Sequence, residues 1–343
     1  MLKIGAASNS WGGVRSHEFP ANAAFGLRVR PTEDPGDVGI VRELNRCMNQ
    51  KNIDDMIRFW GVRGSIATPG PGTSKTGGNT SCVECTFGDQ SIVFDAGTGL
   101  RGLGDHWMKQ GIPESCSILL SHTHWDHIQG LPFFTPLYMP SSKIGLYGQA
   151  PASLSLWEAM QRQMTAPHFP VRFEDLPSSL QAHEVRVGES FSIGNVVVRT
   201  ARGNHPGGVV AYRVEYNHTS VVYATDTEHY ACLDPVLQQL SEGADILIYD
   251  AQYTPEEYSG IGKNGSPGRA RVGWGHSTYV AACELAKAAN VRNLVLFHHD
   301  PSHDDDALDE IEVRARELFS STTLAREGAV MAMQRGELET RAA

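Results

Sequence analysis

The sequence predicts an α/β protein, or α+β in some classification schemes, in which two β-sheets stack face to face and helices cover the outside. Two features of the 343-residue chain favour this class. Short apolar runs of strand length alternate with glycine-containing turns from Met56 onward, and a series of strands is followed by helical segments twice along the chain. No internal repeat of solenoid length is present in the sequence.

The strands are expected where β-branched and aromatic residues cluster between turns. The first begins at Met56 in MIRFWGVRGS, and SCVECTFGD and SIVFDAGTG form two strands joined by a Gly-Asp turn. SILLS, at 117–121, is a short buried strand that leads into a histidine-rich loop. Later strands are expected at 195–201, 209–216, 220–226, 246–253 and 293–299.

Three segments are expected to form helices. Residues 151–164 show one apolar face, and the helix should open at Pro151. A second helix is expected over 277–289 with Ser277 as its N-cap, and an amphipathic third over 307–319.

Composition divides the chain near residue 55. Residues 1–55 mix Gly, Asn, Arg, Pro and Asp with little periodicity, as in PTEDPGDVG from Pro31. We expect them to be a weakly ordered or peripheral N-terminal extension, and residues 56–335 to form one folded domain.

The bulk composition limits location and partners. A formal net charge of −10 argues against binding of nucleic acid or anionic membranes over the general surface. No apolar run is long enough to span a bilayer, and the N-terminus lacks the pattern of a secretory signal, so a cytoplasmic location is expected. Cys82 and Cys85 lack the second pair that a structural zinc site needs. Their spacing in a strand places them on opposite faces, as reduced packing residues.

The segment LLSHTHWDHIQG places His122, His124, Asp126 and His127 close together. So many imidazole and carboxylate groups repel one another or need solvation unless a cation lies between them. Side chains two apart in an extended segment share a face, so His122 and His124 can point at one ion. Asp126 and His127 follow the turn and can point at a second ion. This mixture of ligands suits zinc, manganese or iron.

Four side chains cannot complete two metal sites, because a catalytic zinc usually takes three protein ligands and keeps one position open. Three further candidates stand at the ends of expected strands: His205 in GNHPGG, Asp226 and His298. A lone histidine such as His205 is more often a surface or core residue than a ligand. Its assignment therefore depends on the histidine-rich loop.

This order, HxHxDH followed by His, Asp and His at strand ends, resembles that of the metallo-β-lactamase-fold hydrolases from about Met56 to Phe319. The resemblance implies a four-layer αββα sandwich, with 56–335 as the hydrolase domain, and two divalent metal ions, zinc or else manganese or iron. Asp95, in FDAGTG, matches an early aspartate that supports the metal loop. The implied ligands are His122, His124 and His205 for one ion, Asp126, His127 and His298 for the other, and Asp226 as a bridge.

A paired metal site lowers the pKa of its bound water, so we expect hydrolysis by attack of a metal-bound hydroxide. The segment GWGHST resembles the GHST element of the phosphodiesterase branch, which includes ribonuclease Z and the phosphoribosyl cyclic phosphodiesterases. The resemblance implies that His276 contacts the phosphate or protonates the leaving oxygen, supported by Asp250. With Asp126 these are the expected catalytic residues; alternatively, His276 is a helix cap or a surface residue.

A basic, glycine-rich segment before His276 contains Lys263, Arg269 and Arg271, which could hold a phosphate. An exposed loop without a binding role is the alternative. No cofactor besides the metal ions is expected.

The expected substrate is a small phosphodiester, such as a cyclic nucleotide or cyclic phosphate. Ribonuclease Z carries a long arm for transfer RNA before the bridging aspartate, and here only a hairpin's length separates His205 from Asp226. This spacing and the net charge argue against long nucleic acid as a partner; a homodimer is a further possibility, and no membrane is involved. Three alternatives stay open: a thioester or lactam hydrolase of the same fold, a transfer RNA 3′-processing endonuclease, and a non-catalytic nucleotide sensor.

Overall fold

The computed structural model describes residues 55–150, 153–261, 266–334 and 337–341. The described residues belong to one compact unit. The predicted N-terminal extension lies outside the described residues apart from Asp55. Among the helices described, none combines the length and hydrophobicity that a bilayer crossing requires.

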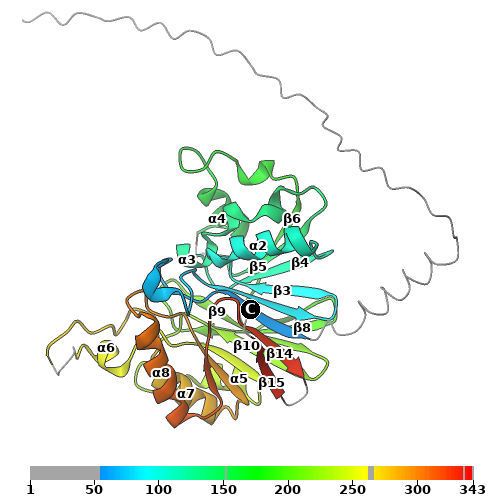
Figure 1. Cartoon of the computed structure of the whole chain (residues 1–343). Helices are drawn as coiled ribbons and strands as arrows, with labels where there is room; N and C mark the ends of the chain where they lie inside the picture. Colours follow the sequence, from blue (N-terminus) through cyan, green and yellow to red (C-terminus); the bar gives the residue numbers. More distant parts are fainter. Residues whose placement is uncertain (1–54, 151–152, 262–265, 335–336, 342–343) are drawn as a thin grey trace, which may run out of the picture. The chain divides into compact units, whose positions relative to one another are not determined.

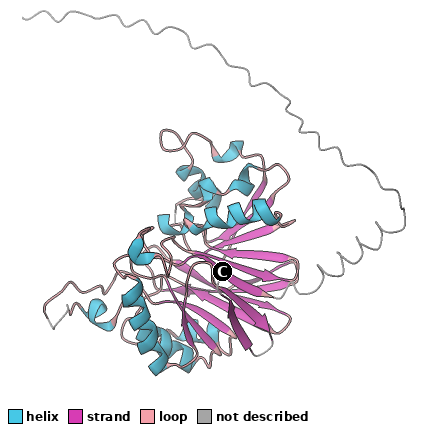
Figure 2. Cartoon of the chain, viewed as in Figure 1, coloured by secondary structure: helices cyan, strands magenta, loops and turns pink. Residues whose placement is uncertain are grey.

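Two mixed β-sheets stack on each other, as Figure 1 and Figure 2 show. The first sheet has the order β15 (Glu337–Arg341), β14 (Val330–Gln334), β1 (Met56–Gly61), β2 (Cys82–Phe87), β3 (Gln90–Phe94), β4 (Cys116–Leu120), β5 (Lys143–Gly148) and β6 (Ser179–Glu184). The second has the order β13 (Thr322–Leu324), β12 (Asn293–Phe297), β11 (Ile246–Asp250), β10 (Thr219–Ala224), β9 (Val209–Tyr216), β8 (Val196–Gly203) and β7 (Ser190–Ile193). Strands β3 to β6 are parallel, and so are β10 to β13.

Helices cover the outer face of each sheet and complete four layers (Figure 1). The first sheet carries α2 (Gly99–Gln110) and α4 (Leu156–Gln163), and the second carries α5 (Pro235–Ser241), α7 (Tyr279–Ala288) and α8 (Asp305–Leu318). Two shorter helices, α3 (Trp125–Ile128) and α6 (Pro255–Ser259), lie in connections. This arrangement confirms the predicted αββα sandwich.

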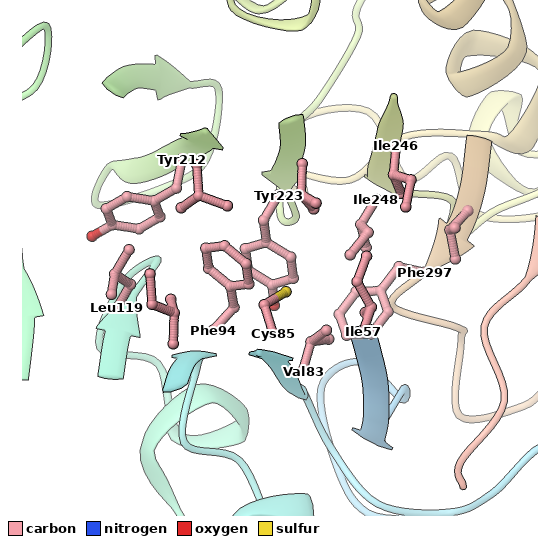
Figure 3. Packing of buried hydrophobic residues seen from close by; sticks show 14 of the residues in the cluster. Ile57, Val83, Cys85, Phe94, Leu119, Tyr212, Tyr223, Ile246, Ile248 and Phe297 are labelled. Carbon is pink, nitrogen blue, oxygen red and sulfur yellow. The ribbon is translucent and has the colours of Figure 1, made fainter. Parts of the chain in front are cut away.

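The core between the sheets is apolar and aromatic (Figure 3). Phe94 of β3 and Tyr223 of β10 stack with ring centroids 4.8 Å apart, and Phe297 of β12 packs edge-on against Tyr223. Because strand side chains alternate, Cys85 faces this core while Cys82 faces the outer helices. Both thiols are buried and free, as predicted.

The predicted strands are found, and several end earlier than expected. β10 and β12 stop before Asp226 and His298, where φ becomes positive. The helix predicted from Pro151 begins instead at Leu156, because Ser155 forms a capping box with Glu158. The prediction that Ser277 caps the next helix was wrong. Thr278 caps α7, whereas the hydroxyl of Ser277 donates to a backbone carbonyl.

Glu84 of β2 is a buried carboxylate beneath α2. The indole N–H groups of Trp60 and Trp107 each donate to one of its oxygens at 2.9 Å. Both oxygens thereby have a partner, which is the condition for burying a carboxylate at acceptable cost.

Replacing Glu84 with alanine is expected to leave both indole N–H groups without an acceptor. Since each unsatisfied buried donor costs about 1–3 kcal/mol, the free energy of unfolding in urea should fall by about 2–6 kcal/mol. Glu84→Gln keeps one acceptor and should lose about half as much. Wild-type stability of Glu84→Ala would show that the indoles find other partners.

Candidate metal centre

Most of the predicted site residues lie at strand ends, along one edge of the sandwich. The histidine-rich loop follows β4, His205 follows β8, Asp226 follows β10, Asp250 ends β11 and His298 follows β12. Because β10, β11 and β12 are parallel neighbours, their carboxyl ends lie side by side.

The first group consists of His122, His124 and His205, with ligand nitrogens within 4.8 Å of one another. Their ring centroids are 4.4 to 4.9 Å apart in pairs. Burial lowers the pKa of all three below the ordinary histidine value. Each imidazole is therefore neutral near pH 7, which is the form that binds metal ions.

The second group consists of Asp126, His127, Asp226 and His298, all buried. His127 Nε2 lies 3.2 Å from an oxygen of Asp126, and it lies 3.2 Å from Oδ1 of Asp226. Burial alone would lower the pKa of His127, but Asp126, Asp226 and Asp95 raise it well above the usual range. The carboxylates therefore favour a positive charge at His127, which a proton supplies when no metal ion is bound.

Asp226 lies between the two groups. Its Oδ1 faces Nε2 of His127 and of His298, at 3.2 and 3.1 Å. Its Oδ2 lies 3.8 Å from Nε2 of both His122 and His205. One carboxylate with an oxygen toward each group has the geometry of a bridging ligand.

The outer ring nitrogens of three histidines contact acceptors, which fixes the tautomers. Each Nδ1 donates its proton outward, so each Nε2 directs a lone pair into the cluster. The pairs are His127 with Asp95 at 2.7 Å, His205 with the carbonyl of Gly275 at 3.0 Å, and His298 with Oε1 of Gln252 at 3.0 Å.

The inward lone pairs fit a divalent metal ion. His127 Nε2 and His298 Nε2 are only 3.3 Å apart, and two lone pairs at that distance repel unless a proton or a metal ion lies between them. His122 Nε2 is buried and has no hydrogen-bond partner in the described part of the chain. A set of imidazole and carboxylate donors suits zinc, manganese or iron.

Asp95 supports the histidine-rich loop. It is fully buried and accepts hydrogen bonds from the N–H and hydroxyl of Ser121, from Nδ1 of His127 and from the hydroxyl of Tyr223. All four distances are between 2.7 and 2.9 Å. Through Tyr223 the loop is tied to the core between the sheets.

Sequence reasoning missed two residues in the loop after β1. The N–H of Ser65 donates to Oδ2 of Asp126 at 2.8 Å. Gly64 lies so close to His298 that a Cβ would overlap the imidazole ring. The glycine in VRGS could have indicated a close approach, but the sequence does not show which side chain approaches it.

His276 and Asp250 form a buried pair beside the second group. His276 Nδ1 donates to Asp250 Oδ2 at 2.9 Å, and the ring of His276 stacks on that of His298. Burial lowers the pKa of His276, but Asp250 raises it more, to about 9. Together with Asp226 and His298, the pair forms a third group whose ligand atoms are close enough to share an ion.

A cavity of about 580 Å³ opens over the site. Five of the site residues line it, together with Trp125 and Trp274. The guanidinium carbons of Arg269 and Arg271 each lie 5.1 Å from the Trp274 ring, so these arginines stack on the wall of the cavity instead of lining it. Lys263 lies outside the described residues.

Known proteins share this architecture. The family model described as the β-lactamase superfamily domain matches residues 90–299. A ribonuclease Z from Mycobacterium sp. (strain KMS) is 30% identical over 255 residues, which cover 68% of this chain and 78% of the relative. This chain belongs to the β-lactamase superfamily.

Solved structures share the fold. A diphosphatase of the PhnP family aligns with a TM-score of 0.58 at 18% identity, covering 83% of this chain and 99% of that one. The short form of human tRNase Z aligns with a TM-score of 0.57 at 20% identity, covering 82% and 100%. The chain thus has the metallo-β-lactamase fold, and the family match and the ribonuclease Z relative support the predicted hydrolase. The ribonuclease Z relative goes against our expectation that long nucleic acid is not a partner.

Asp95→Asn tests whether Asp95 orients His127 of the second metal group. An asparagine cannot accept from all four donors, so His127 loses its fixed orientation. Because such outer partners of metal-binding histidines are worth about 10- to 100-fold in metal affinity, we expect a loss of that size in a Zn²⁺ competition titration. Tyr223→Phe, which removes one hydrogen bond to Asp95 and spares His127, should lower thermal stability only. Equal Zn²⁺ affinity of Asp95→Asn and wild type would contradict this role.

Proposed function

We propose that this chain is a dinuclear metal-dependent hydrolase that cleaves a small phosphodiester of the cyclic nucleotide or cyclic phosphate type. The position of Asp226 carries the proposal. It turns one oxygen toward each group of histidines, and the pair formed by His276 and Asp250 stands beside it.

The two groups would hold one ion each. When bound, a pair of divalent ions supplies a nucleophilic water at neutral pH and neutralises charge on phosphoryl oxygens. Zinc suits the donors, as do manganese and iron. The proposed ligands are His122, His124 and His205 for the first ion, Asp126, His127 and His298 for the second, and Asp226 for both.

His276 would act as the general acid toward the leaving oxygen. Asp250 accepts the Nδ1 proton, so the proton available for transfer is the one on Nε2. His276 also lines the cavity over the metal groups, whereas Asp250 is fully buried behind it. A thioester or lactam hydrolase of the same fold does not need this pair.

Two observations favour a small substrate. The described segment between His205 and Asp226 contains only the β9–β10 hairpin, without an inserted arm. The net charge of −10 also disfavours a long RNA interface. The identity to a ribonuclease Z favours a second candidate, an endonuclease that processes the 3′ end of transfer RNA.

A substrate panel separates these functions. The metal-loaded protein is expected to hydrolyse bis-p-nitrophenyl phosphate and a cyclic nucleotide, to leave S-lactoylglutathione intact, and to cleave a precursor transfer RNA more slowly than the small diesters. Turnover of the thioester alone would rule out a phosphodiesterase. Faster cleavage of the precursor would favour the second candidate, and no turnover at full metal loading would indicate a nucleotide sensor.

His276→Ala is expected to lower the turnover of small phosphodiesters by about 10²–10⁴-fold, the usual contribution of a general acid. Both ions should stay bound, because Asp226 and His298 keep their other contacts. Steady-state kinetics and elemental analysis measure the two effects. His168→Ala, at an exposed histidine after α4, is the matched control. Loss of an ion together with activity would place His276 among the metal ligands instead.

A further inference from the structure

Glu228 is a fully buried carboxylate just after β10, and the reaction proposed above gives it no chemical role. Its oxygens accept three hydrogen bonds. Oε1 accepts from the hydroxyl of Tyr258 and the N–H of Gly273, both at 2.7 Å, and Oε2 accepts from the N–H of Gly275 at 2.9 Å. The segment that Glu228 holds leads directly into His276.

Gly275 connects Glu228 to the first metal group, because it contacts both Glu228 and His205. Its carbonyl accepts the hydrogen bond from Nδ1 of His205 at 3.0 Å, which fixes the tautomer of that ring. A Cβ on Gly275 would overlap the His205 ring, and its φ of 89° also favours glycine. The orientation of His205 therefore depends on where Gly275 is held.

The backbone of Glu228 holds the other side of His205. The N–H of Glu228 donates to the carbonyl of Asn204 at 2.8 Å, and Nδ2 of Asn204 donates to the carbonyl of Glu228 at 3.2 Å. The residue before His205 and the residue that contacts its ring are thus both attached to Glu228.

We propose that Glu228 is a positioning residue that locks the segment 273–276, so that His205 directs Nε2 into the first metal group and His276 stays beside Asp226. This inference rests on the function proposed above, because it concerns residues of the same site.

The three donors require a carboxylate at position 228. Glutamine offers a single acceptor oxygen, so its amide nitrogen would face the N–H of either Gly273 or Gly275. The glycine that loses its acceptor then shifts, and the contact between Gly275 and His205 shifts with it.

Glu228→Gln in the metal-loaded full chain tests this role. We expect kcat on bis-p-nitrophenyl phosphate to fall by about 10- to 100-fold, as for small displacements of catalytic groups, with a smaller change in KM. In a Zn²⁺ titration, one of the two binding steps should weaken by about tenfold or more while the other is unchanged.

Tyr258→Phe is the matched control. It removes one hydrogen bond to the same carboxylate but keeps the bond to Gly275. We therefore expect kcat and both Zn²⁺ affinities to change by less than about threefold.

Wild-type kcat and two wild-type Zn²⁺ affinities in Glu228→Gln would overturn the proposal. Equal losses in Glu228→Gln and Tyr258→Phe would also overturn it, since general destabilisation would then explain both. If Glu228→Gln does not fold, Gly275→Ala should weaken the binding of one Zn²⁺ ion in the same titration, and unchanged binding of both ions would overturn the proposal.

The Zn²⁺ titration does not depend on catalytic turnover. A wild-type protein without phosphodiesterase activity would end the proposed function, and the titration would still decide the role of Glu228.

Discussion

Five imidazoles and two carboxylates share a largely buried space in which only added positive charge relieves their mutual repulsion. In His127, His205 and His298 the outward nitrogen contacts an acceptor, so Nε2 of each ring faces the cluster. Asp95, Gln252 and the carbonyl of Gly275 are those acceptors. Each acceptor is held in turn by another segment, such as Tyr223 for Asp95 and Glu228 for Gly275. The surrounding loops can therefore be understood as supports for a cation site.

Several residues of the site lie directly after the end of a strand. Asp95, Asp226 and His298 each follow a strand and have φ values of 60°, 51° and 62°. A left-handed backbone at a residue other than glycine costs free energy and is concentrated at functional sites. The apolar core between the sheets, with Phe94 stacked on Tyr223, lies immediately behind these turns and stabilises them.

The grouping of the candidate ligands could be predicted because four of them lie in one short loop, and the resemblance to the metallo-β-lactamase-fold hydrolases implied the three distant ones at strand ends. Apart from Asp95 and Asp250, which the resemblance implied, the supports could not be predicted. Ser65, Gln252 and Glu228 act through contacts between segments far apart in sequence, and no motif signals them. Likewise α2 was missed because Gly102 and Gly104 interrupt its helical pattern, although Gly104 allows close packing against Phe134. Charge alone indicated a basic segment near the site, but its position depends on the stacking against Trp274.

The most direct test of the two-ion site is an anomalous difference map from crystals of protein purified without chelator, recorded at the absorption edge of its metal. We predict two peaks about 3.5–4 Å apart, the usual separation in two-metal sites. One should lie among His122, His124 and His205, the other among Asp126, His127 and His298, with Asp226 between them. A single peak, or ions bound elsewhere, would contradict the shared site, and a map without peaks would contradict the requirement for a metal.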